Sequence, residues 1–585
     1  MSSTVRQQEL VLKGIPASPG IAIGPLFLYR KQAPQIQEKS ISAAEADQEV
    51  ARLQQSLSRS QKELRKILDF AEAKLGNSQA RIFEAQLMIL EDTVLFDAIY
   101  ARIRSELKNV EFVVENEIGK YHRMMVASND EYTRERAHDV EDVKNRILRN
   151  LQEERLISRL DGSYVIVSHN LAAADALMLS RNDVLGYAME VGGVTSHTAL
   201  LARALRIPTV VGLRELIGRI HPGDVLILDG YSGVVIINPN DETIEEYERR
   251  REKYRQFEKR LEGLRDLPAE TLDGRRIHLG ANIELEEELE TLHPQGADGI
   301  GLYRSETLLF GKEVFPSEDE QFERYKRLVD AVYPKPVIIR TFDIGGDKMM
   351  VQTIKENNPF LGWRGIRVML AKEDLFLDQL RAILRASSRK TVSVMFPMVS
   401  NIKEVREAKA MLEVAKRKLR EHNIPFDDEI KVGVMVEVPA AAVIAEDLAR
   451  EVNFMSIGTN DLIQYLLAVD RTNDIVADLY QEFHPAVIRV VRRIIERGKG
   501  QNVWVGMCGE MAGDPLATVL LVGLGLDEFS VVPAVLPEIK KIIRSIRFDE
   551  AKKLAHEVLQ MQTEDEIKGY LKSYMREKFP DIPIE

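Results

Sequence analysis

The feature that most constrains the fold is a series of short apolar runs in the C-terminal half of the chain. Between about Leu267 and Glu585 these runs alternate with segments of helical pattern, and they read IHLGANIE, GIGLYRSE, VIIRTFDIGG, VSVMFPM, VGVMVEV, NFMSIGTND, VWVGMCGE and LDEFSVV. There are eight of them. Strands that alternate with helices in this number are typical of a closed (β/α)8 barrel, and the segment is long enough for one with insertions. The sequence therefore predicts a TIM-type barrel in this half.

Nearly every run ends in side chains that can do chemistry. These residues are Asn282, Glu284, Arg304, Glu306, Arg340, Asp343, Glu437, Asn460, Asp461, Cys508 and Glu510. The C-terminal ends of barrel strands meet at one face, and the active sites of such barrels are built there. The alternative, that each residue merely begins a surface loop, is acceptable for one strand but does not account for six in series. We therefore expect a single site at this face.

The residue types at these strand ends indicate anion chemistry with a metal. Arg304, Arg340 and Arg471 could converge on phosphate and carboxylate groups, to which a guanidinium makes bidentate bonds. Glu437 and Asp461 offer hard oxygen ligands of the kind that suit Mg²⁺. Each residue alone could belong to a structural ion pair. Together they predict a small ligand with two anionic groups.

The N-terminal half changes character twice. Residues from Leu10 to Tyr29 alternate Gly and Pro with short apolar runs, which predicts two short strands. From about 42 to 152 apolar residues recur at steps of three, four and seven, which predicts a bundle of helical hairpins. Strand patterns return from Ser163, with a hairpin expected at 230–233, Gly-Tyr-Ser-Gly. The simplest interpretation is one β/α domain interrupted by a helical insertion.

A charged segment marks the expected domain boundary. Residues 241–265 are dense in charge and poor in apolar positions, as in an exposed connecting helix. The predicted architecture is therefore an α/β multidomain chain. Its expected parts are a β/α domain (1–31 and 149–240), an inserted helical domain (32–148), a linker helix (241–265) and the barrel (266–585).

Composition excludes several classes of protein. With 45% hydrophobic and 29% charged residues the chain is an ordinary globular protein. Its longest apolar stretches, such as Thr518 to Leu526, fall far short of the ~20 residues that span a bilayer, and the N-terminus lacks the apolar core of a signal peptide. We therefore expect a cytoplasmic protein with no membrane partner. One cysteine, Cys508, excludes an intrachain disulfide, and the net charge of -12 argues against nucleic acid and favours a basic protein partner.

A second candidate site lies in GGVTSHTALLARALRIPTVVGL. Thr195 or Ser196 is expected to cap a helix, which would place His197 at the helix N-terminus. Free amide donors and the helix dipole favour a phosphoryl group on the ring and disfavour the imidazolium, which makes the histidine a better nucleophile. For the isolated motif, a histidine that only caps a helix is the commoner alternative.

At this point the motifs resemble those of a known family. Over essentially its whole length the chain resembles enzyme I of the bacterial phosphoenolpyruvate-dependent phosphotransferase system. GGVTSHTALLAR is similar to the family's phosphohistidine signature. SIGTNDLIQYLLAVDR, GMCGEMAGDP, RTFDIGGDK and ENNPFLGWRGIR are similar to its barrel motifs, in the same order and spacing.

The resemblance implies a phosphoenolpyruvate-protein phosphotransferase that works in sugar uptake. It implies that His197 is phosphorylated by phosphoenolpyruvate and that Cys508 is the proton donor that converts enolpyruvate to pyruvate. The implied substrate-binding residues are Arg304, Arg340, Arg471 and the backbone of Asn460 and Asp461, and the implied Mg²⁺ ligands are Glu437 and Asp461. The acceptor would be the histidine-containing phosphocarrier protein, HPr, docked on the helical domain. The phosphohistidine domain would swivel on the linker, and the barrel would form a homodimer.

One departure from the family pattern concerns the surroundings of His197. Where the family commonly has Asp-Leu-Thr-Pro-Ser, this chain has Asn-Leu-Ala-Ala-Ala at 170–174, so that Ala172 replaces the threonine that would bond the imidazole. Thr195, Ser196 and Asp175 remain alternatives for orienting the ring.

Two other classes of protein share some of these features. A pyruvate phosphate dikinase or phosphoenolpyruvate synthase shares the histidine and barrel motifs but needs an ATP-binding module, and no segment here resembles one. A catalytically idle scaffold would have lost a catalytic residue, and none is lost. The acceptor could belong to a sugar or to a nitrogen-type regulatory branch; the lack of an amino-terminal sensory domain favours sugar uptake.

Overall fold

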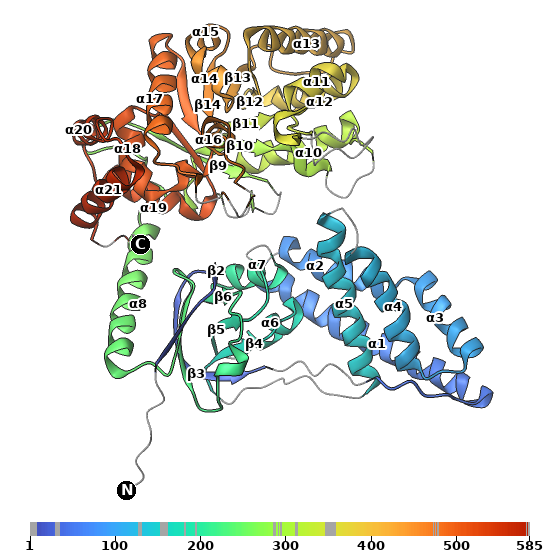
Figure 1. The fold of residues 1–585 in the computed structure, drawn as a ribbon. Coiled ribbons are helices and arrows are strands. Elements are labelled where there is room, and N and C mark those ends of the chain that lie inside the picture. Colours follow the sequence, from blue (N-terminus) through green and yellow to red (C-terminus); the bar gives the residue numbers. More distant parts are fainter. Residues whose placement is uncertain are drawn as a thin grey trace. The chain divides into compact units, whose positions relative to one another are not determined.

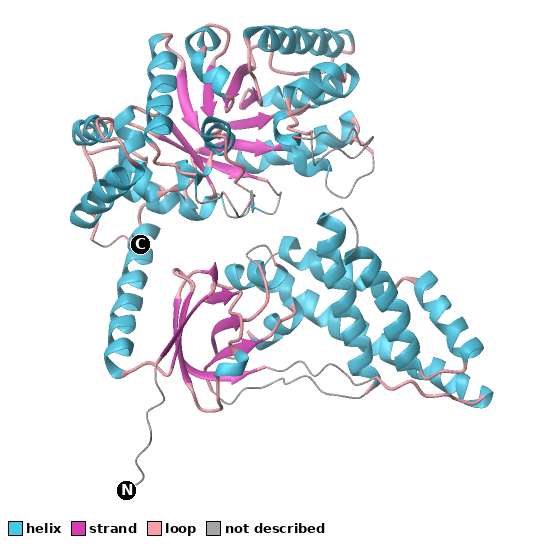
Figure 2. Ribbon diagram, viewed as in Figure 1, coloured by secondary structure: helices cyan, strands magenta, loops and turns pink. Residues whose placement is uncertain are grey.

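The computed structural model describes most of the chain as two compact units (Figures 1 and 2). The residues outside the description are 1–8, 30–35, 76, 127–130, 153–161, 181–182, 194–195, 285–287, 290–291, 293–294, 310–313, 346–357, 472, 474–475, 477–478, 581 and 583–585. The units divide between Arg255 and Gln256, inside helix α8 (Asp241–Glu262). The finer domain boundaries expected above stay predictions.

The first unit is built on an eight-stranded mixed sheet, in the order β1-β8-β7-β3-β4-β5-β6-β2. Its strands are β1 (Leu10–Lys13), β2 (Ile15–Ser18), β3 (Ile21–Leu28), β4 (Tyr164–Ser168), β5 (Val184–Met189), β6 (Thr209–Val211), β7 (Val225–Asp229) and β8 (Val234–Ile237). The series β3-β4-β5-β6 is parallel, whereas the remaining pairs are antiparallel. The predicted hairpin at 230–233 is confirmed, because it joins the antiparallel pair β7 and β8.

The N-terminal segment forms three strands, not the two predicted. Gly14 separates β1 from β2, which pair with β8 and β6 at opposite edges of the sheet. A Cβ atom on Gly14 would lie only 2.5 Å from the carbonyl oxygen of Val211, so the crossing requires a glycine. Sequence pattern alone did not reveal this crossing, because a change of partner strand leaves the apolar alternation intact.

The predicted helical insertion is confirmed as a bundle. Its helices are α1 (Ala43–Leu75), α2 (Asn77–Leu90), α3 (Thr93–Glu106), α4 (Val110–Val126) and α5 (Glu131–Leu151). Leu53, Leu57 and Leu64 from the predicted apolar stripe are buried along α1. The bundle shares a hydrophobic core with α6 (Ala173–Leu179), α7 (His197–Ala204) and one face of the sheet.

Helix α8 is less exposed than its composition suggests. Arg250 forms an ion pair with Asp229 at the end of β7, with Nη2 and Oδ2 3.2 Å apart. Tyr254 stacks on Tyr231, with ring centroids 4.0 Å apart. Most of α8 is therefore anchored to the sheet of the first unit, whereas Phe257 near its C-terminus belongs to the core of the second unit.

The second unit contains the predicted barrel, which is closed and entirely parallel (Figure 1). Its strands are β9 (His278–Ile283), β10 (Gly299–Arg304), β11 (Val337–Arg340), β12 (Val392–Phe396), β13 (Lys431–Val436), β14 (Phe454–Ile457), β15 (Trp504–Met507) and β16 (Glu528–Val531). Each coincides with one of the eight apolar runs in the sequence. The TIM-type fold is thus confirmed.

Helices surround the barrel and bury its outer face (Figure 2). They are α10 (Glu318–Val332), α11 (Ile366–Ala371), α12 (Glu373–Ala386), α13 (Ile402–Glu421), α14 (Pro439–Val443), α15 (Ala445–Ala449), α16 (Thr459–Leu467), α17 (Pro485–Gly500), α18 (Pro515–Leu524), α19 (Leu536–Arg544), α20 (Phe548–Val558) and α21 (Glu564–Lys578). Local sequence sets several of their starts. For example, the Ser317 hydroxyl accepts from the Glu320 amide while the Glu320 carboxylate accepts from the Ser317 amide, a capping box at α10.

A separate cluster of side chains fills the barrel interior. Leu302, Ile338, Met395, Met435, Phe454 and Cys508 form it. This packed floor places Cys508 at the boundary between the hydrophobic interior and the polar face above it. In the part of the chain that the structure describes, no helix has both the length and the apolar character needed to cross a membrane.

Candidate active site

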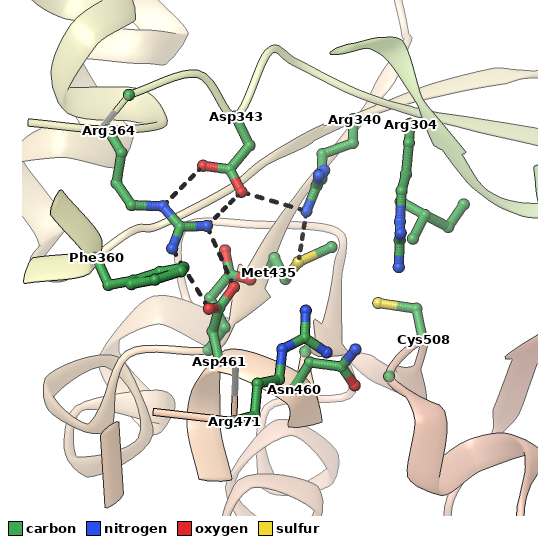
Figure 3. Close-up of a pocket in the computed structure, with 15 residues that line it drawn as sticks. Arg304, Arg340, Asp343, Phe360, Arg364, Met435, Asn460, Asp461, Arg471 and Cys508 are labelled. Atoms are coloured by element: carbon green, nitrogen blue, oxygen red, sulfur yellow. Dashed lines mark hydrogen bonds and ion pairs between the residues drawn. The ribbon is translucent and has the colours of Figure 1, made fainter. Parts of the chain in front are cut away.

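A polar cavity of about 120 Å³ lies at the C-terminal ends of the barrel strands (Figure 3). Its lining includes each barrel residue for which a catalytic, substrate-binding or metal-binding role was predicted: Arg304, Arg340, Glu437, Asn460, Asp461, Arg471 and Cys508. Closure of the barrel brings these residues together from strands β10, β11, β13, β14 and β15 or the loops that follow them. The roles assigned to them remain predictions. The other acidic and amide residues expected at this face, except Asp343, are not part of the lining but contact residues that are: Asn282, Glu284, Glu306 and Glu510.

Arg340 ends β11 and is held by two buried carboxylates. Its Nη2 lies 3.1 Å from Oε1 of Glu306, and its Nη1 lies 3.6 Å from Oδ2 of Asp343. Burial alone would lower the pKa of the guanidinium, but the charges of Glu306, Asp343 and Glu437 outweigh burial and raise it. Arg340 is therefore a fixed positive charge in the cavity wall.

Arg364 is the main residue that the sequence analysis missed. Its guanidinium bridges Asp343, with Nη2 and Oδ2 2.7 Å apart, and Asp461, with Nη2 and Oδ2 3.3 Å apart (Figure 3). Tyr465 also accepts a hydrogen bond from Nη1 at 3.1 Å. Arg364 lies inside the motif ENNPFLGWRGIR, which by itself indicates no role for the arginine. Its distance from any strand end concealed its place in the cavity.

Glu437 is the most deeply buried acidic group of the cavity, with 1% of its surface exposed. Oε1 accepts a hydrogen bond from the amide of Met398 at 2.6 Å. Burial, with the charges of Asp461 and Asp343, raises the pKa of Glu437 to about 8, although Arg340 and Arg364 oppose the shift. Such crowding of carboxylates is unfavourable unless a cation neutralises it.

The fit to Mg²⁺ can be tested on these donors. Among the described residues no three or more His, Cys, Asp and Glu side chains are arranged to hold a metal ion by themselves. Mg²⁺ usually takes one or two protein carboxylates and completes its shell with water and substrate oxygens. Glu437 and Asp461, close enough for their charges to interact, fit that mode of binding.

Asn460 and Asp461 occupy the first turn of α16, whose N-cap is Gly458. Amides in the first turn of a helix have no partner within the helix and point toward any anion placed there. The side chain of Asn460 bonds Glu510, with Nδ2 and Oε1 2.8 Å apart, and Glu510 also accepts from Nη1 of Arg471 at 3.0 Å. These contacts hold the α16 turn beside the loop after β15.

Arg304 completes the set of cationic groups. Its Nη1 pairs with Glu284, which follows β9. Among the described residues, the buried Nε atoms of Arg304 and Arg340 have no hydrogen-bond partner. Buried N–H groups of this kind normally have an acceptor, so the two arginines retain donors for an anionic ligand.

Cys508 lies directly after β15 and is 3% exposed. Its Sγ lies 3.8 Å from the carbonyl oxygen of Ile457. Burial raises the pKa of the Cys508 thiol to about 11, so the group is a protonated thiol near neutral pH. A Cβ atom on Gly509 would lie 1.8 Å from Oγ1 of Thr459, so a glycine is required where this loop meets α16.

His197 lies in the first unit, as the first residue of α7. Ser196 is the N-cap, and its hydroxyl accepts from the amide of Ala199 at 3.3 Å. The expected position at a helix N-terminus is thus confirmed. Thr195, the other candidate cap, lies outside the described residues.

Two of the three groups considered for orienting His197 are engaged elsewhere. The Ser196 hydroxyl caps α7. Asp175 is buried on α6 beside Tyr29, and burial followed by the charge of Asp175 raises the pKa of that phenol. Ala172 itself has no polar side chain and lies just before α6. Thr195, the third group, lies outside the described residues, so the group that orients His197 stays a prediction.

Comparison with known proteins agrees with this geometry. The family described as "PEP-utilising enzyme, PEP-binding domain" matches residues 258–548, "PEP-utilising enzyme, mobile domain" matches 160–233, and "PEP-utilising enzyme, N-terminal" matches 13–136. The phosphoenolpyruvate-protein phosphotransferase of Staphylococcus carnosus is 40% identical over 569 residues, which cover 97% of this chain and 99% of that protein. The protein of the same name from Haemophilus influenzae is 41% identical over 571 residues, which cover 97% and 99%. A solution structure titled as Enzyme I (nEIt) is 39% identical, covers 42% of this chain and 99% of that chain, and has a TM-score of 0.38.

The barrel, the mobile domain and the polar cavity thus define a phosphoenolpyruvate-utilising enzyme. Within that class, the chain belongs to the family of phosphoenolpyruvate-protein phosphotransferases, or enzyme I.

Proposed function

We propose that this chain transfers the phosphoryl group of phosphoenolpyruvate first to His197 and then to HPr. Such a transfer is the first step of the sugar phosphotransferase system. The observation that carries the proposal is the convergence of Arg304, Arg340 and Arg471 on one cavity that also contains Glu437 and Asp461. A ligand with a phosphate and a carboxylate is the natural complement of that arrangement.

Substrate binding is proposed to use fixed charge. Arg340 is held by the buried carboxylates of Glu306 and Asp343. Moving it out of the cavity would leave these charges unpaired, which is strongly unfavourable. Together with Arg304 and Arg471, Arg340 would neutralise the phosphoryl oxygens and the substrate carboxylate. The first-turn amides of Asn460 and Asp461 add donors that need no rearrangement.

Mg²⁺ would be held by Glu437 and Asp461, and when bound it would neutralise charge on the transferred group and share the substrate's oxygens. The protein's own residues hold these ligands in position. Arg364 pairs with both Asp343 and Asp461 and so holds Asp461 in place. Preorganised charge of this kind supplies most of the rate in phosphoryl transfer.

The chemical step exchanges one bond to phosphorus for another. A ring nitrogen of His197 attacks in line, an N–P bond forms, and the bond between phosphorus and the enol oxygen breaks. The enolpyruvate left behind takes a proton at its methylene carbon from the Cys508 thiol, and pyruvate results. Solvent then returns a proton to the sulfur.

His197 and the cavity belong to different units, so the transfer requires movement. We propose that the phosphohistidine domain swivels on the α8 segment, between the barrel and the helical domain where HPr docks. A homodimer through the barrel and a cytoplasmic location are parts of the same proposal. We propose the sugar branch and not the nitrogen-type regulatory branch. The relatives from Staphylococcus carnosus and Haemophilus influenzae are both named phosphoenolpyruvate-protein phosphotransferase, and that name mentions no regulatory role.

The direct test is phosphorylation by radiolabelled phosphoenolpyruvate. His197→Ala should take up no label while keeping its affinity for phosphoenolpyruvate, because nucleophile and binding site lie on separate units. Acid-labile phosphate that persists in this variant would disprove the assignment. Adding candidate phosphocarriers to the labelled wild-type protein then identifies the acceptor.

A further inference from the structure

A second histidine lies on the segment next to the one that carries His197. The parallel pairing of β4 and β5 continues past both strand ends: the amide of Glu190 donates to Ser168 at 3.1 Å, and the amide of Val191 donates to the carbonyl of His169 at 3.0 Å. His169 is thus fixed at the start of the loop after β4, beside the start of the loop that leads to His197.

The other end of the same loop is tied to α7. The hydroxyl of Thr198, in the first turn of that helix, donates to the carbonyl of Leu171 with Oγ1 and O 2.5 Å apart. Thr198 is buried, so the contact is shielded from solvent. The stretch 168–171 is therefore attached on one side to residues 190–191 and on the other to the helix that begins at His197.

The side chain of His169 is oriented by Glu190. Nδ1 of His169 lies 2.8 Å from Oε2 of Glu190, and the other carboxylate oxygen accepts from the amide of Ile217 at 2.8 Å. An ionised carboxylate only accepts, so Nδ1 carries the hydrogen and Nε2 is the nitrogen free to meet a ligand. The glutamate side chain is 14% exposed, whereas the imidazole is 69% exposed.

This arrangement is costly for a purely structural contact. An exposed ion pair adds little to the stability of a fold, yet here the mostly buried carboxylate of Glu190 binds the exposed ring of His169. A carboxylate that fixes the tautomer and direction of an imidazole is typical of histidines that act on a ligand.

We propose that His169 is a positioning residue for the phosphoryl group carried by His197. With Nδ1 bound to Glu190, Nε2 is the nitrogen left for the ligand, and when it carries a hydrogen it donates a hydrogen bond to a phosphoryl oxygen. The bond is charge-assisted and strengthens as negative charge gathers on the group. His169 neither accepts the phosphoryl group nor moves a proton to carbon. The inference rests on the proposed phosphorylation of His197.

The test compares four single variants of the full-length chain in the presence of Mg²⁺ and phosphoenolpyruvate. His169→Ala should slow phosphorylation of His197 about tenfold, the loss expected for one charge-assisted bond in the transition state, with little change in KM. His169→Gln, whose amide can donate from nearly the position of Nε2, should recover most of the rate. Glu190→Gln should give an intermediate loss.

His221→Ala is the matched control. That histidine is also exposed, and its Nδ1 lies 3.9 Å from Oδ2 of Asp224 in the same unit. This variant should retain the wild-type rate.

Phosphorus NMR supplies a readout that a merely structural role would not change. The resonance of the phosphohistidine should shift between wild type and His169→Ala, and stay in place in His221→Ala. A rate for His169→Ala within twofold of wild type, an unshifted resonance, or a glutamine variant as slow as the alanine variant would each overturn the proposal.

Two further outcomes separate this proposal from the one it rests on. Label on His169 in the His197→Ala protein would make His169 an acceptor and not a positioning residue. Absence of label on His197 in the wild-type protein would refute the proposed function itself, and the role of His169 with it, before any His169 variant is measured.

Discussion

The side-chain amide of Asn282 donates a hydrogen bond to the backbone carbonyl of Cys508, with Nδ2 and O 3.0 Å apart. The oxygen of the same amide accepts from the hydroxyl of Ser530 at 2.6 Å. The ends of β9 and β16 thus fix the position of the residue that follows β15. A fixed backbone suits the role proposed for Cys508, because a proton donor has to meet one carbon atom of its substrate.

Replacing Cys508 separates a packing role from a chemical one. Cys508→Ala should cost no more than ~1 to 2 kcal/mol in stability, because the thiol is small. It should slow pyruvate formation by ~100- to 10,000-fold, because a positioned acid is lost. Transfer between phosphorylated HPr and His197 should survive, since that step protonates no carbon. Pyruvate release within a few-fold of wild type would show that Cys508 is structural.

The hydrogen bond from Asn282 to the carbonyl of Cys508 predicts an indirect effect on catalysis. Asn282→Ala removes both hydrogen bonds and leaves Cys508 free to shift, so kcat for pyruvate formation should fall about tenfold while KM changes little. Steady-state kinetics with phosphoenolpyruvate measures both quantities. A rise of about tenfold in KM with unchanged kcat would instead place Asn282 in substrate binding.

Arg364 is predicted to act through its planar fork and not through charge alone. Arg364→Lys keeps the charge but cannot bridge Asp343 and Asp461, so kcat/KM should fall about 10- to 100-fold. The apparent affinity for Mg²⁺ should fall as well, because Asp461 loses its support. A lysine variant with nearly normal activity at low Mg²⁺ would contradict this role.

Glu437 is predicted to be needed for the metal and not for the fold. Glu437→Gln keeps the shape of the side chain and the bond from the Met398 amide, yet it removes the anionic ligand. Turnover should no longer respond to a Mg²⁺ titration, while the melting temperature stays at or above that of wild type. Glu538→Gln is the control, because burial raises the pKa of Glu538 to about 7 outside the cavity lining. Equal Mg²⁺ dependence in both variants would argue against the assignment.

A pH effect on stability is expected from Glu528, which lies inside the barrel beside Gly280 and Gly301. Burial, with a smaller effect of the Asp298 charge, raises the pKa of Glu528 to about 8 from its usual 4.5. Between these values the folded protein holds a proton that the unfolded chain has lost. The contribution of Glu528 to the free energy of unfolding is therefore fully present below pH 4.5 and is lost as the pH rises toward 8.

Glu528→Gln should remove that loss. The variant should gain up to a few kcal/mol over wild type at pH 8, with a difference that shrinks toward pH 5. Denaturant unfolding of the two proteins at several pH values measures it. A difference that does not depend on pH would show that Glu528 keeps an ordinary pKa in the fold.

Much of the fold followed from local pattern. The eight apolar runs are the eight barrel strands, and the stripe that includes Leu53 and Leu57 is buried in the helical bundle. Ser196 caps α7 and places His197 at its N-terminus. Periodicity and capping are read within a few residues of the chain, so the sequence itself was sufficient to determine them.

The contacts within the site were decided by the tertiary structure. Arg364 meets Asp461 across 97 positions, and His169 meets Glu190 across 21. Neither pairing leaves a local signal, because it depends on how a sheet or barrel closes and how the loops then fold over its edge. The change of partner strand at Gly14 was hidden for the same reason. Sequence determined which side chains stand at strand ends and helix starts, whereas only closure of the fold determined which charges face each other.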